Sequence, residues 1–249
     1  MARLFVSDLH LDGGAPEAIA QFVDFARTHA VGAEALYILG DLFETWTGDD
    51  DSDADKRVIC RELKGLTDSG VACFALHGNR DFLLGQGFCE ATGCVLLTDP
   101  VVAEFDGERV LLTHGDVLCT DDDSYQQLRS VVRDPRWQSR FLALPRARRE
   151  QLMNAARAGS RRHTARIVPT IMDVNTDTVA AAYRSARVRR IIHGHTHRPA
   201  IHADTLEGTP VERIVLGAWY EQGSYLRYEN GAYELRELPR ARGAAIAQA

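Results

Sequence analysis

Short apolar runs alternate with stretches of helical period along the first two thirds of the chain. Five runs, rich in β-branched or large apolar residues and ending in polar ones, predict buried strands. They are RLFVSD (3–8), ALYILGD (35–41), VACFALHGN (71–79), RVLLTHGD (109–116) and VRRIIHGH (188–195). Amphipathic stretches at 16–30 and 56–69 separate the first three runs and predict helices. This alternation predicts an α/β fold.

The last third of the chain has a different pattern, with strands and no intervening helical period. ERIVLGAWY (212–220) and SYLRYENGAYELREL (224–238) alternate apolar and polar residues, and ENG predicts a hairpin turn within the second. A layer of sheet on sheet, flanked by helices, accommodates both patterns. The final PRARGAAIAQA (239–249) predicts a loose tail.

Length and composition restrict the class of protein. A chain of 249 residues with 45% hydrophobic residues predicts one domain over 1–249. Its five cysteines form no CxxC pair, which argues against a disulfide framework or a thiolate zinc site and suits a reducing cytoplasm. The N-terminal MARLFVSDLH lacks the features of a secretory signal, and no run is long enough to cross a bilayer. Any membrane contact is therefore expected to be peripheral.

Charge is distributed unevenly along the chain, whose net charge is −6. The segment from Arg129 to Arg166 contains eleven arginines and only two acidic residues, Asp134 and Glu150. Its net charge is therefore +9, and that of the remainder of the chain is −15. The residues 121–168 predict a helical insertion in which arginines interleave with apolar residues, namely Val131, Val132, Trp137, Phe141, Leu142, Leu144 and Leu152. Three roles are open for such helices: they can lie at an anionic membrane surface, cover a ligand that is both charged and apolar, or pack on the core as an ordinary amphipathic insertion.

Metal-binding side chains follow the predicted strands. Asp, His and Asn residues stand at the end of each run, at Asp8, His10, Asp41, Asn79, His114, His195 and His197. Strand ends in α/β sheets converge on one crevice. Nitrogen and oxygen ligands without thiolate suit Mn²⁺, Fe or Zn²⁺, and a carboxylate such as Asp41 can bridge two ions roughly 3.5–4 Å apart. Taken singly, an aspartate at such a position is more often a helix cap or turn residue, and a histidine is more often buried in the core. Five such motifs in series, each at a strand end, together indicate a metal site.

The series DLH, GDLFETW, GNRD, THGD and GHTH, spanning residues 8–197, resembles the calcineurin-like metallophosphoesterases. The resemblance implies a sandwich of two mixed β-sheets flanked by helices. It also implies two ions, one held by Asp8, His10, Asp41 and His197 and the other by Asp41, Asn79, His114 and His195. A hydroxide bridging the ions would attack phosphorus.

Arg80 stands where most members of that family carry a histidine. An arginine cannot donate a proton near neutral pH, but it can stabilise phosphoryl charge with two hydrogen bonds. A phosphate leaving group needs no proton, so Arg80 favours cleavage of a phosphoanhydride. The alternative is that Arg80 forms an ion pair with its neighbour Asp81.

Further motifs, LFETWTGDDD, HGNRDFLLG, LCTDDDSYQ, IMDVN, HGHTHRP and LGAWYEQGS, resemble a subfamily, the UDP-2,3-diacylglucosamine diphosphatases of Gram-negative lipid A synthesis. This resemblance implies hydrolysis of UDP-2,3-diacylglucosamine to UMP and a lipid phosphate, with two Mn²⁺ ions. It implies that the insertion caps the acyl chains and that the enzyme sits peripherally on the cytoplasmic face of the inner membrane. Neither a nucleic-acid partner nor an obligate protein partner is expected.

The resemblance also implies a set of functional residues. Catalytic roles fall on Asn79, Arg80 and His195. Substrate contacts fall on Asn79, Arg80, Asp122, Tyr125, Arg157, Ser160, Thr164, Arg166, Ile167 and His195. The resemblance implies a lysine near position 167, where this chain has Ile167 with Arg166 beside it, so either Arg166 supplies that cation or the contact is missing.

Two other functions stay open. A phosphoesterase for soluble nucleotides would not need the apolar face of the insertion, and a protein-binding scaffold would not need intact ligand motifs. The acidic run GDDDSDADK (48–56) predicts a polar loop beside the site, because Lys56 occupies the position where a calcium loop needs glycine.

Overall fold

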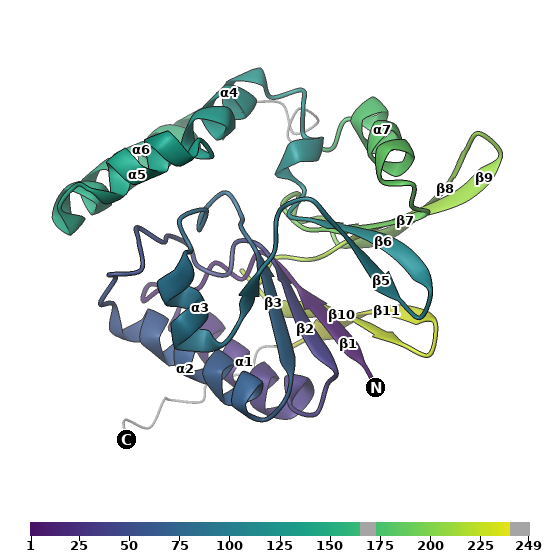
Figure 1. Ribbon diagram of the computed structural model, residues 1–249, viewed down its shortest axis with the longest axis horizontal. Helices are drawn as coiled ribbons and strands as arrows, with labels where there is room; N and C mark the ends of the chain where they lie inside the picture. Colours follow the sequence, from purple (N-terminus) through teal and green to yellow (C-terminus); the bar gives the residue numbers. More distant parts are fainter. Residues whose placement is uncertain (165–172, 240–249) are drawn as a thin grey trace.

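The computed structural model describes residues 1–164 and 173–239, and for residues 161–164 only the backbone. Within these residues two β-sheets face each other (Figure 1). The six-stranded sheet has the order β11-β10-β1-β2-β3-β4 and the five-stranded sheet the order β5-β6-β7-β9-β8. Parallel and antiparallel pairs occur in both, so the predicted sandwich of two mixed sheets is confirmed.

Eight strands overlap the predicted runs, whereas β4, β5 and β8 were not predicted. The first sheet contains β1 (Arg3–Val6), β2 (Ala35–Leu39), β3 (Ala72–Leu76), β4 (Val95–Leu96), β10 (Gly223–Glu229) and β11 (Ala232–Leu238). The second contains β5 (Val101–Phe105), β6 (Glu108–Thr113), β7 (Arg190–His193), β8 (Ala200–Leu206) and β9 (Thr209–Val215). The residues after β1, β2, β3, β6 and β7 carry the expected ligands.

Alternation along each strand divides the core into layers. In β1, Phe5 points between the sheets, where it packs with residues such as Phe105 and Ile192, while Leu4 and Val6 face the helices. The helices α1 (Pro16–Phe25), α2 (Ala54–Asp68) and α3 (Gln86–Thr92) cover that outer face (Figure 1). On the other sheet α7 (Thr176–Ala186) packs through Tyr183. Buried apolar layers on both sides thus hold the strand ends in place.

Two local predictions have clear outcomes. The turn between β10 and β11 places Asn230 and Gly231 at φ of 52° and 80°, the two positive values that a two-residue hairpin requires, so the predicted hairpin is confirmed. The stretch 16–30 was predicted as one helix, but its last turn, Ala26–Ala30, is a π-helix. None of the described helices is long and apolar enough to cross a membrane.

Three helices stand apart from the sandwich, between β6 and β7 in the chain. After a short 3₁₀ turn (Asp116–Leu118) come α4 (Asp123–Val132), α5 (Pro135–Leu142) and α6 (Arg146–Thr164). They extend together over the ends of β1, β2 and β3 (Figure 1), and we call them the cap. Trp137 stacks on Phe141 at 4.9 Å and approaches Phe82 at 6.2 Å, which joins the cap to the apolar core.

Candidate metal centre and adjoining cavity

The backbone at the expected ligands has an unusual conformation. Five of the seven residues have positive φ, between 51° and 67°: Asp8, His10, Asp41, His195 and His197. Non-glycine residues rarely adopt this region, and such residues concentrate at functional sites. Backbone hydrogen bonds hold the turns, with the N–H of Asp8 donating to Gly40 O (3.1 Å) and that of His10 to Asp41 O (3.0 Å). These turns bring side chains that follow different strands to one point.

Two neighbouring glycines leave no room for a side chain at this point. A Cβ atom at Gly78 would lie 2.0 Å from Asp41 Oδ1, and one at Gly194 would lie 2.1 Å from Ser7 Oγ. Both distances are far inside van der Waals contact. The ligand-bearing turns can therefore pack together only with glycine at these two positions.

The first group of ligand atoms belongs to Asp8, His10 and His197, which lie within 4.8 Å of one another. His197 Nε2 is 3.2 Å from Asp8 Oδ1 and 3.4 Å from His10 Nε2. His10 Nε2 is also 3.8 Å from Asp41 Oδ2. Two imidazoles and two carboxylates facing one point form a donor set that suits a divalent ion.

The second group belongs to Asp8, Asp41 and His114, also within 4.8 Å of one another. His114 Nε2 lies 2.9 Å from Asn79 Oδ1, and His195 Nδ1 lies 3.0 Å from the same oxygen. The structure therefore brings all seven predicted ligand residues together. Their nitrogen and oxygen atoms, without a thiolate, fit the divalent ions predicted from the sequence.

Two of the histidines are oriented by hydrogen bonds on the ring nitrogen that faces away from the centre. His10 Nδ1 lies 2.8 Å from Glu44 Oε2, and His114 Nδ1 lies 2.9 Å from the carbonyl oxygen of Leu39. When Nδ1–H donates to these acceptors, Nε2 keeps its lone pair for a metal. Glu44 in turn pairs with Arg157 of the cap.

Burial and charge shift the pKa values of the centre. Burial raises the pKa of Asp41 to about 6 and lowers that of His195 to about 4. Burial alone would lower the pKa of His114, but the charges of Asp41 and Asp8 raise it to about 9. With a pKa of about 9, His114 is protonated at neutral pH when no cation is bound.

Asp81 does not pair with Arg80, which was the alternative for that arginine. It is fully buried, and its carboxylate accepts hydrogen bonds from the N–H groups of Leu42 and Gly78, both at 2.8 Å. The Arg80 side chain instead lines a cavity. Asp81 thus fixes the turns after β2 and β3, and Arg80 is directed at the site.

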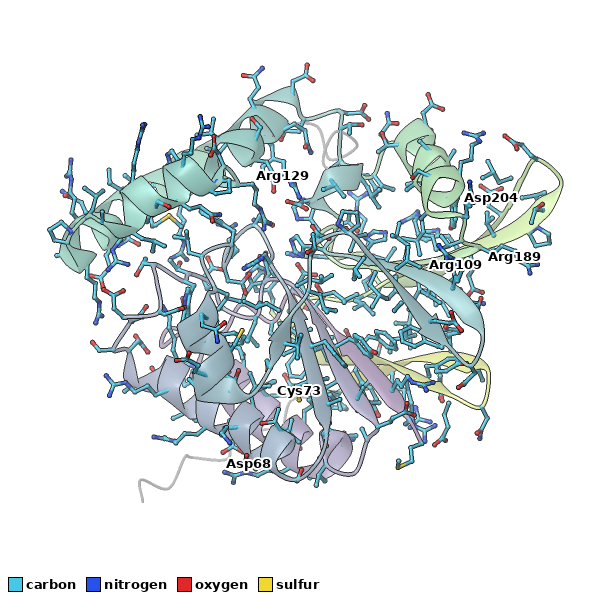
Figure 2. The ribbon with its side chains drawn as sticks, viewed as in Figure 1. Asp68, Cys73, Arg109, Arg129, Arg189 and Asp204 are labelled. Atoms are coloured by element: carbon cyan, nitrogen blue, oxygen red, sulfur yellow. The ribbon has the colours of Figure 1, made fainter. Side chains whose placement is uncertain are left out.

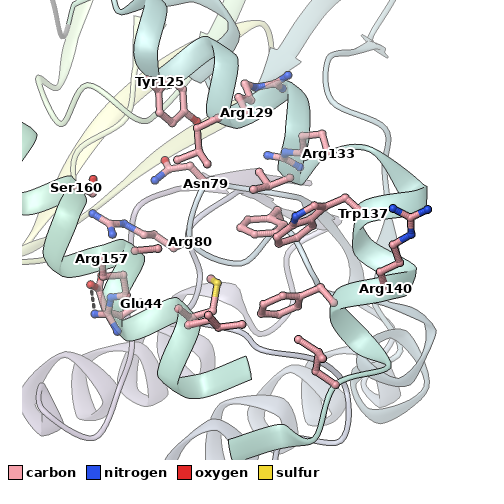
Figure 3. A pocket seen from close by; sticks show the side chains of 18 residues that line it. Glu44, Asn79, Arg80, Tyr125, Arg129, Arg133, Trp137, Arg140, Arg157 and Ser160 are labelled. Carbon is pink, nitrogen blue, oxygen red and sulfur yellow. Dashed lines mark hydrogen bonds and ion pairs between the residues drawn. The ribbon is translucent and has the colours of Figure 1, made fainter. Parts of the chain in front are cut away.

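The cavity, about 610 Å³ in volume, lies between the cap and the sandwich (Figure 3). Its polar end carries Asn79, Arg80, Tyr125, Arg157 and Ser160. Its apolar part is lined by Phe82, Leu128, Val132, Trp137, Phe141, Leu144, Leu152, Met153 and Ala156. The polar end meets the metal centre at Asn79, and Tyr125 stacks near His195 with ring centroids 5.9 Å apart.

The remaining expected substrate contacts are placed differently. Asp122 caps α4, its Oδ1 accepting from the N–H of Tyr125 at 2.9 Å, and it is absent from the lining of the cavity as described. Thr164 ends α6, and its side chain lies outside the described residues, as do Arg166 and Ile167.

Sequence reasoning missed three residues beside the centre. Asp116 is fully buried and accepts from Tyr125 Oη (2.6 Å) and Arg129 Nε (2.8 Å), which fixes α4 above His195. Glu44 links His10 to Arg157. Tyr220 stacks on His10, with centroids 4.9 Å apart and 12° between the planes. All three lie within quoted motifs, THGD, LFETW and GAWY, which was the available signal.

The acidic run serves local structure. Asp49 accepts from the N–H groups of Gly85 and Gly87, Asp51 pairs with Lys56 at 2.7 Å, and Asp53 caps α2. These contacts support the prediction of a polar loop and not that of a calcium-binding loop.

Comparison with known proteins places the chain among phosphoesterases. The model of the family described as calcineurin-like phosphoesterase matches residues 1–199. Proteins named UDP-2,3-diacylglucosamine hydrolase from Enterobacter sp. (strain 638) and from Salmonella typhi are each 46% identical over 239 residues, covering 96% of this chain and 100% of the relative. Among solved structures, that of an archaeal phosphodiesterase matches with a TM-score of 0.50 and 14% identity over 96% of this chain and 100% of its own, a likeness of fold alone.

Proposed function

The chain belongs to the calcineurin-like phosphoesterase family, and from this premise we propose that it is a UDP-2,3-diacylglucosamine diphosphatase. It cleaves the phosphoanhydride of UDP-2,3-diacylglucosamine, giving UMP and 2,3-diacylglucosamine 1-phosphate (lipid X) for lipid A synthesis. Relatives of that name, similar over nearly the whole chain, support this proposal.

The observation that carries the proposal is the cavity that joins the metal centre to an apolar space. One end presents Asn79, Arg80 and Arg157, and the other presents side chains such as Trp137 and Leu152 (Figure 3). A substrate with a diphosphate at one end and two acyl chains at the other matches this arrangement. A water-soluble nucleotide would leave the apolar part without a role.

We propose that two divalent ions, Mn²⁺ by preference and Fe or Zn²⁺ as alternatives, occupy the centre. Asp8, His10, Asp41 and His197 hold one, and Asp41, Asn79, His114 and His195 hold the other. When bound, such ions supply an activated water and neutralise charge on phosphoryl oxygens. The fit of the donor atoms, buried and all nitrogen or oxygen, supports this assignment.

The chain's own residues bind and orient the substrate. Arg80 lies on the cavity wall, where its guanidinium can hold phosphoryl oxygens; it cannot protonate a leaving group near neutral pH. A phosphate leaving group needs no such proton, so the side chain suits an anhydride. Asn79 and His195 complete the catalytic residues at the junction of cavity and centre.

The sugar and acyl chains lie along the cap. Tyr125, Arg157 and Ser160 line the polar end of the cavity and contact the sugar phosphate in this proposal. Asp122, Thr164, Arg166 and Ile167 complete the proposed contacts. In this proposal one domain spans 1–249, with the helical insertion at 121–168, and the enzyme sits peripherally on the cytoplasmic face of the inner membrane.

The test is UMP release by the purified, metal-stripped protein with and without added Mn²⁺. UDP-2,3-diacylglucosamine is the substrate, and UDP-N-acetylglucosamine, which lacks the two acyl chains, is the control. The proposal expects Mn²⁺-dependent release from the acylated compound only. Equal turnover of both compounds would refute the lipid substrate, and no turnover at all would favour a binding scaffold.

A further inference from the structure

The proposed substrate has a nucleoside half for which the apolar cavity has no evident place. That cavity reaches the metal centre at Asn79 and His195, through Tyr125. A second hollow of about 400 Å³ meets the centre at a different residue, His10, and is lined also by Leu9, Ala15, Pro16, Trp219 and Tyr220. Its volume falls within the range typical of small-molecule sites.

Tyr220 gives this hollow its chemical character. The ring stacks on His10 and meets His197 edge to face, with centroids 5.3 Å apart, yet the residue remains 53% exposed. An aromatic ring with one face on a ligand histidine and much of its surface open offers a stacking surface to a planar ring. Nucleobases are ligands of this kind, and stacking does not require a particular hydrogen-bond pattern.

The loop that carries Tyr220 is fixed to the metal centre. The N–H of Trp219 donates to the carbonyl oxygen of Asp8 at 3.0 Å, and its fully buried ring donates through Nε1 to Ser224 O at 2.9 Å. Tyr220 is therefore held at a set distance from the ligands. A stacking surface fixed in this way binds without the cost of ordering a loop.

The opposite wall of the hollow is formed by the start of α1. Ala15 and Pro16 begin α1, and Gly14 precedes them with its N–H bonded to Asp12 Oδ1 at 2.8 Å. These three positions carry no long side chain, and Glu17 and Ala18, the next residues of α1, complete this wall. The hollow thus lies between the start of α1 and the loop that carries Tyr220, with His10 in its lining.

We propose that this hollow is the nucleoside subsite, with the uracil ring stacked on the open surface of Tyr220. The inference rests on the proposed function, and it adds the place where the nucleoside half of the substrate binds. The diphosphate then crosses the metal centre between two separate cavities, with the acylated sugar leaving past Asn79 and the nucleoside past His10. The polar hollow near Asp12, Asp51 and Asn154 is the competing location, but its lining carries no aromatic ring.

The test measures binding of UMP to the Mn²⁺-loaded enzyme by calorimetry, with no turnover involved. Tyr220→Ala should weaken UMP binding by at least about tenfold, because stacking of a base on an aromatic ring is lost. Tyr220→Phe keeps the ring and should keep the affinity. Ala15→Trp should fill the hollow and also weaken UMP binding.

Two control ligands separate loss of stacking from damage to the metal centre. Ribose 5-phosphate has the sugar phosphate but no base, so its binding should be unchanged in Tyr220→Ala. Binding of 2,3-diacylglucosamine 1-phosphate should also be unchanged, whereas Leu152→Ala in the apolar cavity should weaken that ligand and leave UMP unaffected.

Several outcomes would overturn the subsite. They are UMP binding unaltered in both Tyr220→Ala and Ala15→Trp, equal loss of UMP and ribose 5-phosphate in Tyr220→Ala, and loss of UMP in Asn154→Ala instead. Failure of the proposed function would be seen separately, as a wild-type enzyme that releases no UMP from UDP-2,3-diacylglucosamine.

Discussion

His114 balances the charge of the metal centre when no cation is present. Its pKa of about 9, raised above the usual value by Asp41 and Asp8 despite burial, means that an incoming ion displaces one proton below that pH. Mn²⁺ affinity should therefore rise about tenfold per unit between about pH 7 and 8.5. Below about pH 6, Asp41 also binds a proton and the dependence steepens.

Calorimetry in two buffers of different ionisation enthalpy would count the released protons. A Mn²⁺ affinity that does not change over that pH interval would contradict the raised pKa of His114.

Glu44 illustrates a residue that acts through its neighbours. Glu44→Ala removes the acceptor that orients His10, and it leaves Arg157 without its carboxylate partner, so Mn²⁺ affinity should fall about 10–100-fold. Glu44→Gln retains an acceptor for His10 and should lose less. Equilibrium dialysis gives the affinity, and Glu90→Ala, exposed on α3, is the matched control. Equal affinities in Glu44→Ala and the control would show that His10 needs no such partner.

The ligand residues could be predicted from the sequence because each follows a strand directly. Glu44, Asp116 and Tyr220 could not, because their roles depend on side-chain contacts with residues distant in the chain. Tyr220, for example, touches His10 from the other end of the sequence. The type of a residue indicates whether it can bind a metal. Whether it can orient a metal ligand depends on which side chains it contacts in the folded protein.

At the scale of elements, the buried carboxylate of Asp116 is one of the contacts that attach α4 to the sandwich. Asp116 accepts from Tyr125 and Arg129, and although burial alone would raise its pKa, the charges of His114, His195 and Arg129 hold it well below the usual value. Because the pKa of Asp116 is lower in the folded state, its stabilisation is fully present above the unfolded pKa. It is lost as the pH falls from the unfolded pKa through the folded one.

Asp116→Ala should lower the free energy of unfolding by about 3 kcal/mol at neutral pH, because it leaves the partly buried Arg129 with only the longer contact to Asp99, at 3.5 Å. Urea denaturation measures this change. Gln127→Ala, exposed on the same helix, should change stability by less than about 0.5 kcal/mol. A similar effect of both substitutions would mean that the buried pair contributes nothing specific.

The cap offers a prediction on substrate binding. Leu152→Asp places a charge in the apolar part of the cavity and should raise KM for the acylated substrate more than about tenfold. Because Leu152 is 37% exposed, the stability should change little. Gln151→Asp, which adds the same charge on the exposed neighbour, is the control. Unchanged KM in Leu152→Asp would place the acyl chains elsewhere.

The strands that were predicted have a clear apolar pattern, whereas β4, β5 and β8 were not predicted. The buried runs gave β1, β2, β3, β6 and β7 within a few residues. By contrast, β8 has exposed side chains at most positions, and β4 has only two residues, so neither shows the apolar pattern of a buried strand. The last turn of the stretch 16–30 widened to a π-helix, which apolar spacing alone does not distinguish from an α-helix.

At the scale of the whole molecule, the ligands join the two sheets. Asp8, Asp41 and Asn79 follow strands of the first sheet, while His114, His195 and His197 follow strands of the second. Ions that bind across this junction stabilise the folded state by mass action. Chelation with EDTA should therefore lower Tm in a calorimetric scan, and Mn²⁺ should restore it, whereas an unaltered Tm would mean that the ions do not bridge the sheets.

The division of charge seen in the sequence has a structural counterpart. Cap arginines pair with acidic residues of the sandwich, as Arg149 does with Asp50 and Arg146 with Asp51 at 3.4 Å (Figure 2 shows the side chains on both parts). Composition alone left three uses for this arginine-rich segment open. Only the three-dimensional arrangement shows that it covers a cavity beside the metal centre.

Gly78 and Gly194 extend the site beyond the residues that perform chemistry. Neither position has room for a Cβ atom, because Asp41 lies too close to Gly78 and Ser7 lies too close to Gly194. In a saturation library sorted for turnover, these two positions should be as intolerant of change as the ligands themselves. A map of sequence tolerance would then outline the centre by its missing side chains as well as by its metal-binding ones.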